Sequence, residues 1–505
     1  MKTIKRYLTL VLPVLMAAVM MTACSSSKNS EGAFIPKDAY FVADINVGSM
    51  WQKGELANAD QLNSVQLLRT FLQGAAPEID NLFGEIIKDP SSCGIDMERN
   101  IDFFMSKGED GKDMGALVAA LKDQKTFENF ITTLTKDNNI KSEKDGGRQV
   151  LLLDKDCIAV YDENTLVFVI DVDYVNNTDA LKAYAAKIFD LDEDNSMLAD
   201  ENFTKYQDLR QDINFFANYE SILKLSGGAQ SAAMMHYIFP KEDAEALMKS
   251  AIYYTISFEN GAIDIKQGNI GTPENLKKLI NQKFNDKLVN YMPEQTLAAI
   301  TFGINTKELF NYFSKVPILK ELTKEDTDFG TDLEEIVNAF GGSFVASFYG
   351  ATGDTPLFAV ACDITNHDLV AAMLDDMGIA NGIPDSPVKV YLGSDVLVIS
   401  SDANVISAAQ KGGFGNGMSA IADNAKKGNY MYIDLKYQDY PEIMLNSLGI
   451  QPDAASAMIL AMLDYAEYYT VDNNEGHLKL HLTNTTANSL AYTIQTIDQL
   501  AANSL

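Results

Sequence analysis

Histidine, tryptophan and cysteine are scarce in this 505-residue chain, which contains 4 His, 1 Trp and 4 Cys. The sequence also has no Walker A loop, no Gly-x-Ser-x-Gly elbow, no His-Glu-x-x-His and no dinucleotide-binding fingerprint. These absences remove the enzyme classes that carry such motifs. Glycan-cleaving sites often add stacked aromatic residues to their two carboxylates, so the single Trp51 disfavours a glycosidase.

Basic residues are fewer than acidic ones: the chain has 40 Lys and Arg and 70 Asp and Glu, which gives a net charge of −30. This charge makes nucleic acid and anionic lipid surfaces poor partners. The simplest reason for the acidity is the solubility of a secreted protein. Hydrophobic residues at 47% and charged residues at 22% are ordinary for a globular protein, and the length predicts two or more domains.

The cysteines are too far apart for a metal or redox motif of the Cys-x-x-Cys kind. If Cys24 is modified, as argued next, Cys93, Cys157 and Cys362 remain, so at most one disulfide can form. Their apolar neighbours favour buried thiols over a disulfide framework.

The N-terminal segment has the layout of a secretory signal peptide. Its basic start is followed by an apolar run over residues 7–21 and by Met21-Thr22-Ala23-Cys24, which has the form of a lipobox. We therefore expect a signal peptide over residues 1–23, lipid on Cys24 and a polar tether over 24–32. No later segment approaches the about 18 consecutive apolar residues of a transmembrane helix, so the lipid is the expected membrane attachment.

Two parts of the sequence repeat each other. Residues 35–46 and 292–305 each contain a proline-led turn, an alternating strand ending in Ile-Asn, and a following helical stretch. Residues 251–265 and 466–480 each place a Tyr-Tyr-Thr sequence the same distance before a glycine, which indicates a hairpin that turns at the glycine. We predict an α+β fold of two tandem related halves, residues 33–285 and 286–505, each with antiparallel sheet packed by helices.

The lipobox, the Ile-Pro-x-x-Ala opening at Ile35 to Ala39 and the tandem halves resemble a family of uncharacterised Bacteroidetes-type lipoproteins that carry a domain of unknown function. The resemblance implies placement in the cell envelope and no assigned activity. In such organisms an acidic stretch after the lipidated cysteine favours export to the outer surface. Residues 25–28 are not acidic, so we expect the outer membrane's periplasmic face, with surface exposure as the alternative.

An acidic segment has the spacing of a calcium-binding EF-hand loop. Asp190, Asp192 and Asp194 stand at positions one, three and five, and Glu201 stands at position twelve. Asn195 replaces the usual glycine at position six, however, and a solvated acidic connection is the competing interpretation. Calcium is the only cofactor that the sequence suggests.

His477 and His481 are the only histidines close together in the sequence. Their segment alternates like a strand, which puts both on one face but about 13 Å apart by the rise per residue, too far to share a metal ion. We expect them to face solvent, opposite Leu478 and Leu480.

These observations favour a lipid-anchored envelope lipoprotein with a non-enzymatic binding or scaffolding role. Its partners would be the membrane, through Cys24, and an envelope protein or glycan, but no nucleic acid. A hydrolase that uses a carboxylate pair is the alternative, and a calcium-dependent adhesion module is a weaker one. A cleft with two perturbed acids would favour the enzyme, whereas a broad apolar patch or concave sheet would favour binding.

Overall fold

The computed structural model describes residues 31–503 except for short gaps at 76, 136–139, 173–176, 226–227, 280–283, 317–332, 416, 419–421, 426–428, 448–453 and 473–474. Cys24 and most of the expected tether therefore lie outside the described residues. The chain divides into two compact units. Unit 1 comprises Met1–Leu225, Ala251–Ile263 and Asn484–Leu505, and unit 2 comprises Ser226–Ser250 and Asp264–Thr483.

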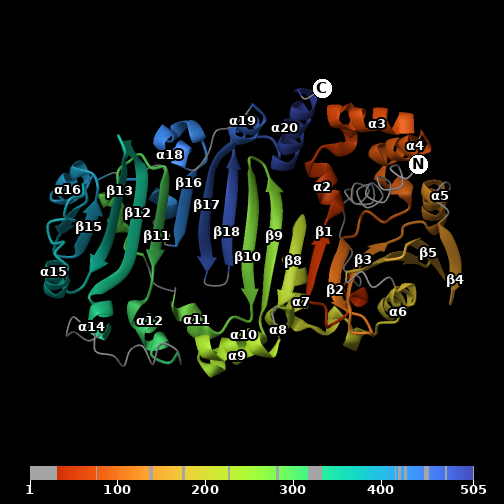
Figure 1. Ribbon diagram of the computed structural model, residues 1–505, viewed down its shortest axis with the longest axis horizontal. Helices are drawn as coiled ribbons and strands as arrows, with labels where there is room; N and C mark the ends of the chain where they lie inside the picture. Colours follow the sequence, from red (N-terminus) through yellow and green to blue (C-terminus); the bar gives the residue numbers. More distant parts are fainter. Residues whose placement is uncertain are drawn as a thin grey trace. The chain divides into compact units, whose positions relative to one another are not determined.

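Unit 1 is built on an antiparallel sheet with the strand order β4-β5-β6-β7-β3-β2-β1-β8-β9 (Figure 1). Its strands are β1 (Phe41–Ile45), β2 (Ile101–Lys107), β3 (Asp113–Ala120), β4 (Lys141–Asp145), β5 (Arg148–Asp154), β6 (Cys157–Tyr161), β7 (Thr165–Asp171), β8 (Ile213–Asn218) and β9 (Ala251–Glu259). Its main helices are α2 (Val47–Lys53), α3 (Asn63–Ala75), α4 (Pro77–Lys88), α5 (Gln124–Thr135), α6 (Thr178–Phe189), α7 (Glu201–Gln207), α8 (Tyr219–Leu225) and α20 (Ser489–Asn503).

Unit 2 contains a second sheet with the order β14-β15-β13-β12-β11-β16-β17-β18-β10. Its strands are β10 (Ala262–Ile270, which enters unit 2 at Asp264), β11 (Ala298–Gly303), β12 (Phe340–Thr352), β13 (Thr355–Ile364), β14 (Lys389–Leu392), β15 (Val396–Ser400), β16 (Tyr430–Asp434), β17 (Leu463–Asp472) and β18 (Glu475–Leu482). Its helices are α9 (Ala229–Ile238), α10 (Lys241–Met248), α11 (Glu274–Leu279), η6 (Asp286–Tyr291), α12 (Thr306–Phe313), α14 (Leu333–Asn338), α15 (His367–Asp376), α16 (Ala403–Ala409), α17 (Ala422–Ala425), η7 (Tyr437–Asp439), α18 (Glu442–Ser447) and α19 (Ala454–Ala461).

The predicted α+β class is confirmed, and the two sheets connect their strands in the same way. β1 pairs with β2 on one side and β8 on the other, just as β11 pairs with β12 and β16. β3 then joins β2 to β7, as β13 joins β12 to β15. The sequence boundaries of the repeats, 33–285 and 286–505, remain a prediction, since the compact units divide the chain differently.

Each Ile-Asn sequence ends a strand and begins a helix. The side chain of Asn46 accepts a hydrogen bond from the Ser49 N–H at the start of α2, and that of Asn305 accepts one from the Glu308 N–H at the start of α12. An asparagine at this position supplies an acceptor to an otherwise unpaired N–H of the first helical turn. The same local device therefore starts a helix in both units.

The second repeated sequence is only partly equivalent in the structure. Gly261 occupies a turn with φ +72°, as predicted, but Gly476 lies inside β18 opposite Thr470, so the prediction of a turn at Gly476 is wrong. The tyrosine pairs also differ, because Tyr253 is buried with the core whereas its sequence match Tyr468 lies opposite exposed Met431. The β16–β17 register places Tyr469, not Tyr468, beside buried Tyr430, so the sequence match is offset by one residue from the structural one, and an offset of one residue exchanges the two faces of a strand.

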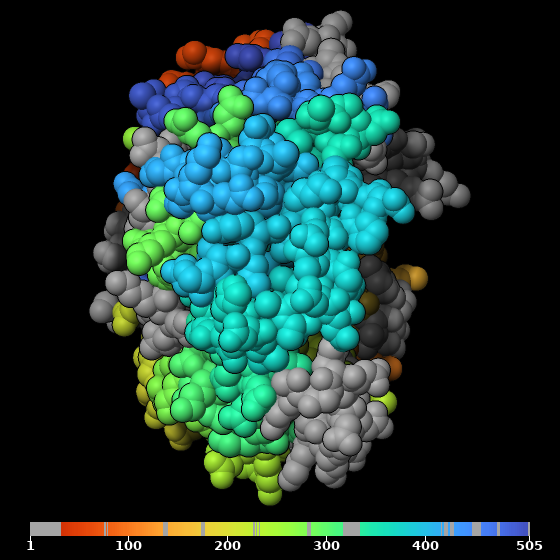
Figure 2. Space-filling view, turned by 90° about the vertical axis from the view of Figure 1, so that its left-hand side faces the viewer, coloured from red at the N-terminus to blue at the C-terminus, as the bar shows by residue number. Residues whose placement is uncertain are grey.

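Helices pack against both faces of each sheet. In unit 1, α5 packs its Phe127 and Phe130 against one face of β3 and β7, and α6 lies over the other face, where Tyr184 contacts the Ser106 hydroxyl of β2. In unit 2, η6 and α16 pack against one face of β11, β12 and β13, and α15 packs against the opposite face at β13 and β15. Figure 2 shows the protein turned so that the β15 end of this sheet faces the viewer, with the cyan to light-blue part of the chain across the middle of the surface.

Candidate binding surface on the sheets

The face of the unit 2 sheet opposite η6 and α16 is apolar, and beyond the part that α15 covers at β13 and β15 it is not fully buried. Along β11 the burial alternates, with Ala299 and Thr301 buried and Ala298, Ile300 and Phe302 only partly so. β16 alternates in the same sense, since Tyr430 is buried while Met431 is 39% exposed. Both faces of these strands therefore carry apolar side chains, but only one face is fully buried.

The strand register defines this surface. Residues that stand opposite each other on neighbouring strands lie on the same face of a sheet. Following the pairs from β13 to β18 gives one continuous set, which we call the open face of unit 2: Phe358, Val360, Phe344, Ala346, Phe348, Ala298, Ile300, Phe302, Met431, Ile433, Ala466, Tyr468, Leu478 and Leu480.

The open face of unit 2 is large and uncharged. Met431, Ile433 and Leu478 are 39%, 39% and 43% exposed, and the remaining members are partly buried. Six strands at about 4.8 Å spacing and two or three rows at about 6.8 Å extend over roughly 400–600 Å² of the sheet plane, of which only part is accessible to solvent. In Figure 1 the strands β16, β17 and β18 are seen face-on, with α18 and α19 beyond their ends. The solvated face of an antiparallel sheet is normally polar, so this face departs from the usual pattern.

Unit 1 carries a similar surface. Phe41 of β1 stacks on Phe215 of β8 with ring centres 5.4 Å apart, and it also contacts Phe103 of β2 at 5.8 Å. Ile45 and Ile170 on the same face are 36% and 39% exposed. The open face of unit 1 consists of Phe41, Ala43, Ile45, Phe103, Met105, Ile170, Ile213, Phe215, Tyr254 and Ile256.

The two histidines of β18 do not face solvent, so that prediction is wrong. His477 is 9% exposed, and Leu478 is the exposed residue, at 43%. His481 is partly buried and contacts the Glu467 carboxylate at 2.9 Å. The alternation was predicted correctly, but the sequence does not show that the apolar side is the uncovered one.

His477 is held by acids and by an aromatic ring. Its Nδ1 lies 3.0 Å from both carboxylate oxygens of Asp264, and its Nε2 lies 3.1 Å from Glu475. The Tyr469 ring stacks on the imidazole at 5.0 Å with an interplanar angle of 4°. The contacts tie β18 to β10.

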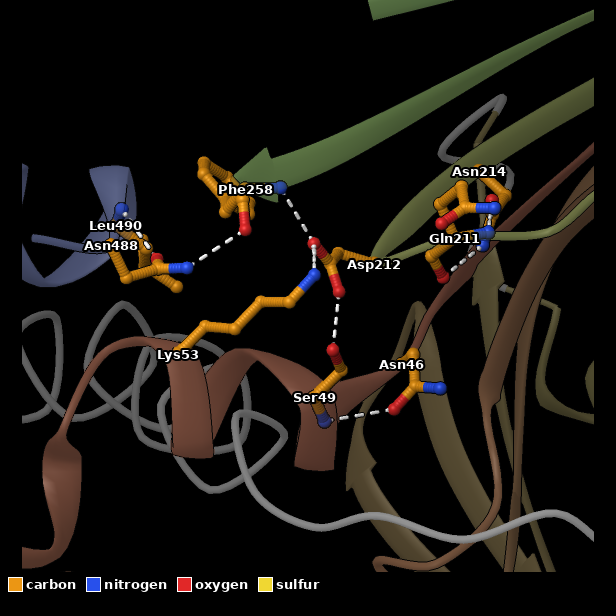
Figure 3. A network of polar contacts seen from close by, with 9 residues as sticks. All are labelled: Asn46, Ser49, Lys53, Gln211, Asp212, Asn214, Phe258, Asn488 and Leu490. Atoms are coloured by element: carbon orange, nitrogen blue, oxygen red, sulfur yellow. Dashed lines mark hydrogen bonds and ion pairs between the residues drawn. The ribbon is translucent and has the colours of Figure 1, made fainter. Parts of the chain in front are cut away.

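A second polar network, in unit 1, centres on Asp212 (Figure 3). Its carboxylate accepts from the Lys53 ammonium at 2.6 Å, from the Phe258 N–H at 2.7 Å and from the Ser49 hydroxyl. The Ser49 proton points to Asp212, and the Lys53 ammonium is paired with the same carboxylate. Because Asp212 and Lys53 are paired with each other, neither is a free base for the Ser49 hydroxyl, as a serine nucleophile would need. The geometry is that of a clamp joining α2 to the strands β8 and β9.

Asp44 forms a third network inside unit 1. It is fully buried and accepts hydrogen bonds from Asn100 at 3.0 Å, Asn214 at 2.8 Å and Tyr206 at 2.6 Å. Burial, and then the neighbouring Asp44 charge, raises the pKa of Tyr206 well above its ordinary value. Tyr206 therefore acts as a hydrogen-bond donor to Asp44 and stays protonated at neutral pH.

Asp102 stands directly opposite Asp44 in the β1–β2 ladder, so two buried carboxylates face each other across neighbouring strands. This is the carboxylate pair that most resembles the hydrolase alternative. The cavity beside Asp102, lined also by Arg99, Asn100 and Thr165, holds about 20 Å³. Such a volume admits about one water molecule and no sugar ring.

The acids of the EF-hand spacing lie at the ends of local elements. Asp190 follows the last residue of α6 and pairs with Arg148 at 2.6 Å, and Asp192 accepts a hydrogen bond from the Asn195 N–H at 2.9 Å. Asp194 lies in a 3-10 turn, and Glu201 begins α7. Within the described parts of the chain, no group of three or more His, Cys, Asp or Glu side chains is arranged to hold a metal ion. Calcium binding remains a prediction.

The three cysteines of the described chain are free thiols. Cys93 is buried, whereas Cys157 and Cys362 are partly buried. Burial raises the pKa of Cys93 and Cys362 to about 11 and that of Cys157 to about 12. Since the thiolate is the reactive form, these side chains pack as small apolar groups rather than act as nucleophiles.

A family model for a domain of unknown function, DUF4836, matches residues 32–490. The chain belongs to this family. The match covers both units and both open faces, and the resemblance expected from the sequence is confirmed to that extent. No curated protein matches this chain.

Two solved structures, crystal forms I and IV of TP0453, are each 8% identical to this DUF4836 protein, with TM-scores of 0.20. Form I is matched over 75% of this chain and 98% of its own, and form IV over 74% and 94%. A TM-score this low carries no argument about fold or function. Among the helices within the described residues, none is long and apolar enough to cross a membrane.

Proposed function

We propose that this DUF4836 protein is a non-enzymatic binding protein of the cell envelope, attached by lipid on Cys24 to the outer membrane and facing the periplasm. In this proposal the open faces bind apolar segments of a partner protein. The observation that carries it is the uncharged open face of unit 2, in a chain whose net charge is −30. Exposed apolar patches of several hundred Å² on soluble proteins commonly mark interaction sites.

The chemistry of the open face supports a protein rather than a glycan as the partner. Glycan hydroxyls need hydrogen-bond donors and acceptors placed around the aromatic rings. On the open face of unit 2, only the Tyr468 side chain carries a polar group of that kind. An apolar polypeptide surface, by contrast, gains from the burial of these side chains by about 25 cal/mol for each Å² removed from water.

Dye binding tests the open face in solution. The folded full chain should enhance the fluorescence of an anilinonaphthalene sulfonate dye, and a Met431→Glu, Leu478→Glu double variant should lose most of that enhancement. Ile383→Glu is the matched control, since Ile383 is 46% exposed but lies in the loop between α15 and β14, outside the open face. Equal enhancement by the wild type and the double variant, with unchanged circular dichroism, would refute binding at this surface.

Site-specific cross-linking tests whether the surface meets a partner in intact cells. A photoreactive amino acid at Ile433 should give a discrete adduct with a second polypeptide, and Met431→Glu should abolish it. The same amino acid at exposed Asp376 in α15 is the control. An adduct of equal yield from Asp376, or none from Ile433, would contradict the proposal.

The lipid anchor has a separate test. Cells supplied with an alkyne-labelled fatty acid should label the wild-type chain and the Cys93→Ser variant, but not Cys24→Ser. Fractionation should move the unlabelled variant out of the outer membrane. If the wild type takes up no label, the anchor is wrong whatever the binding experiments show.

A further inference from the structure

The open face of unit 2 ends at an acidic edge. Antiparallel pairing brings the start of β11, the end of β12, the end of β16 and the start of β17 to the same end of the sheet. The acids in or next to these strand ends are Glu294, Asp354, Asp434, Asp439 and Asp464. We call this set the acidic end.

Lys436 lies within the acidic end but is already paired. Its ammonium lies 2.7 Å from Asp464 and 3.8 Å from Asp434. Burial raises the pKa of Asp434 above its ordinary value, and the nearby carboxylates of Asp439 and Asp464 raise it further, against the opposing effect of Lys436. Negative charge at this end thus exceeds what Lys436 neutralises.

Charge also discriminates among the occupants that an apolar face could take. Two copies of a chain with a charge of −30 repel each other, and so do the chain and an anionic bilayer. A basic polypeptide is attracted instead, both by the whole chain and by the acidic end. Amphipathic segments use apolar side chains for contact with a groove or surface, while their charges select the partner.

On the basis of the proposed function, we infer that the open face of unit 2 binds a cationic amphipathic polypeptide segment of its partner. The apolar side chains of the segment lie on the rows around Ile300, Met431 and Tyr468. Its basic residues lie against the acidic end, beside Asp354 and Asp439, which are both exposed.

The inference predicts a preference that can be measured with synthetic peptides. Two amphipathic helical peptides share one apolar face of Leu and Ala and differ only in carrying Lys or Glu on the other face. The full chain, purified from the cell fraction that contains it, should bind the Lys peptide at least tenfold more tightly in low salt. That ratio should shrink as salt rises, because the Debye length falls from about 30 Å at 0.01 M to about 8 Å at 0.15 M.

Charge reversal locates the preference. The Asp354→Lys, Asp439→Lys double variant should reduce the Lys-to-Glu affinity ratio at least fivefold. Asp375→Lys, Asp376→Lys on α15 makes the same change in net charge and should leave most of the ratio intact. Equal reduction by both double variants would place the effect in the net charge and overturn the assignment to the acidic end.

The remaining outcomes separate this inference from the proposed function. If both peptides bind equally and Met431→Glu abolishes both, the open face binds apolar partners but the cationic preference is wrong. If sedimentation shows a dimer that Met431→Glu dissociates, the occupant is a second copy. Tighter binding to phosphatidylglycerol vesicles than to the Lys peptide would make it a lipid surface. Each of these last two results overturns the inference.

Discussion

Strands β1 and β11 occupy the same place in their two sheets, yet their polar surroundings differ. Counting back two residues from each capping asparagine gives Asp44 in β1 and Gly303 in β11. Asp44 faces Asp102 and Asn214 across the ladder, all three buried. Gly303 instead faces Ser343, and its N–H donates to the Asn429 side chain at 3.2 Å.

The comparison teaches that this strand order does not require a buried carboxylate at its centre. At the equivalent place unit 2 has no charge on the central strand: the Asn429 side chain accepts from Gly303, and the carboxylate of Asp363 on β13, which is only partly buried, accepts from the Ser343 N–H at 2.8 Å. Unit 1 instead places a fully buried charge on the central strand itself, and this charge must be neutralised and hydrogen-bonded. Removing one partner from such a buried network usually destabilises strongly, because the others are left unpaired. The two units should therefore respond very differently to equivalent substitutions.

Asp44→Ala should give the largest loss. It removes the acceptor of Asn100 and Tyr206 and one of the two acceptors of Asn214, and we expect unit 1 to lose about 4 kcal/mol of unfolding free energy. Urea titration followed by Trp51 fluorescence reports on unit 1, because Trp51 lies in α2. In unit 2, Ser343→Ala, at the residue opposite Gly303, should lose only about 1 kcal/mol by circular dichroism. Similar losses would break the comparison.

Asp212→Ala should rank second, with a loss of about 3 kcal/mol in unit 1, because Lys53 and the Phe258 N–H lose a buried acceptor. Trp51 again reports the transition and lies beside the clamp. Asp208→Ala, which removes an exposed acid nearby, should change stability by less than about 0.5 kcal/mol. If Asp212→Ala were equally harmless, the network of Figure 3 would be a surface contact rather than a clamp.

The carboxylate of Glu467 in unit 2 predicts a pH dependence. Burial raises the pKa of Glu467, but hydrogen bonds from His481, Tyr430 and Asn424 lower it by more, so the net pKa lies below the ordinary value. A lowered pKa contributes stability above the unfolded pKa, near 4.5, and this stability is lost as the pH falls through the folded pKa.

Glu467→Gln should therefore cost about 1.5 kcal/mol at pH 7, the scale of a charge-assisted hydrogen bond. The melting temperatures of variant and wild type should converge as the pH falls below 4. Glu442→Gln, on the exposed start of α18, is the control and should differ little from wild type across this range. A gap at pH 3 as large as at pH 7 would show that the Glu467 charge is not the cause.

The smallest expected effect concerns a feature that the two units share, the asparagine cap of the helix that follows the central strand. Asn46→Ala and Asn305→Ala each remove one helix cap of the same geometry, and each should cost about 1 kcal/mol. The amide hydrogens of the first turn should exchange faster in α2 of one variant and in α12 of the other. Asn→Asp at either position should retain most of the stability, because Asp also accepts the N–H. A cap loss in one unit alone would show that the repeated Ile-Asn sequence has different roles.

Local periodicity predicted many elements closely. The Ile-Asn sequences of residues 35–46 and 292–305 each lead from a strand into a helix, and Gly261 turns a hairpin, as predicted. Register was less predictable, as the tyrosine pairs show. Tyr253 and Tyr468 match in sequence, but one faces the core and the other the open face, because β9 and β17 pair with their neighbours in registers that differ by one residue.

The sequence predicted that a binding role would require a broad apolar surface, but not which residues form it. Strands such as β11 and β16 are apolar on both faces, a pattern that sequence reasoning attributes to burial on both sides. The same ambiguity led to the wrong expectation for His477, since an alternating segment does not show which of its faces meets solvent. Asp212 carried no sequence signal at all, because its partners Lys53 and Phe258 are distant in the chain.

By itself, the sequence determined the α+β class, the repeated strand-to-helix units and the capping residues, because these depend on contacts within a few residues. It also predicts the lipid anchor at Cys24 from a local motif. The tertiary structure alone decided which sheet face is covered, which acids are brought together and where the apolar side chains stay exposed. These features depend on pairing between strands that are distant in the sequence. A shift of one residue in that pairing exchanges the two faces of a strand, and local periodicity does not show the register.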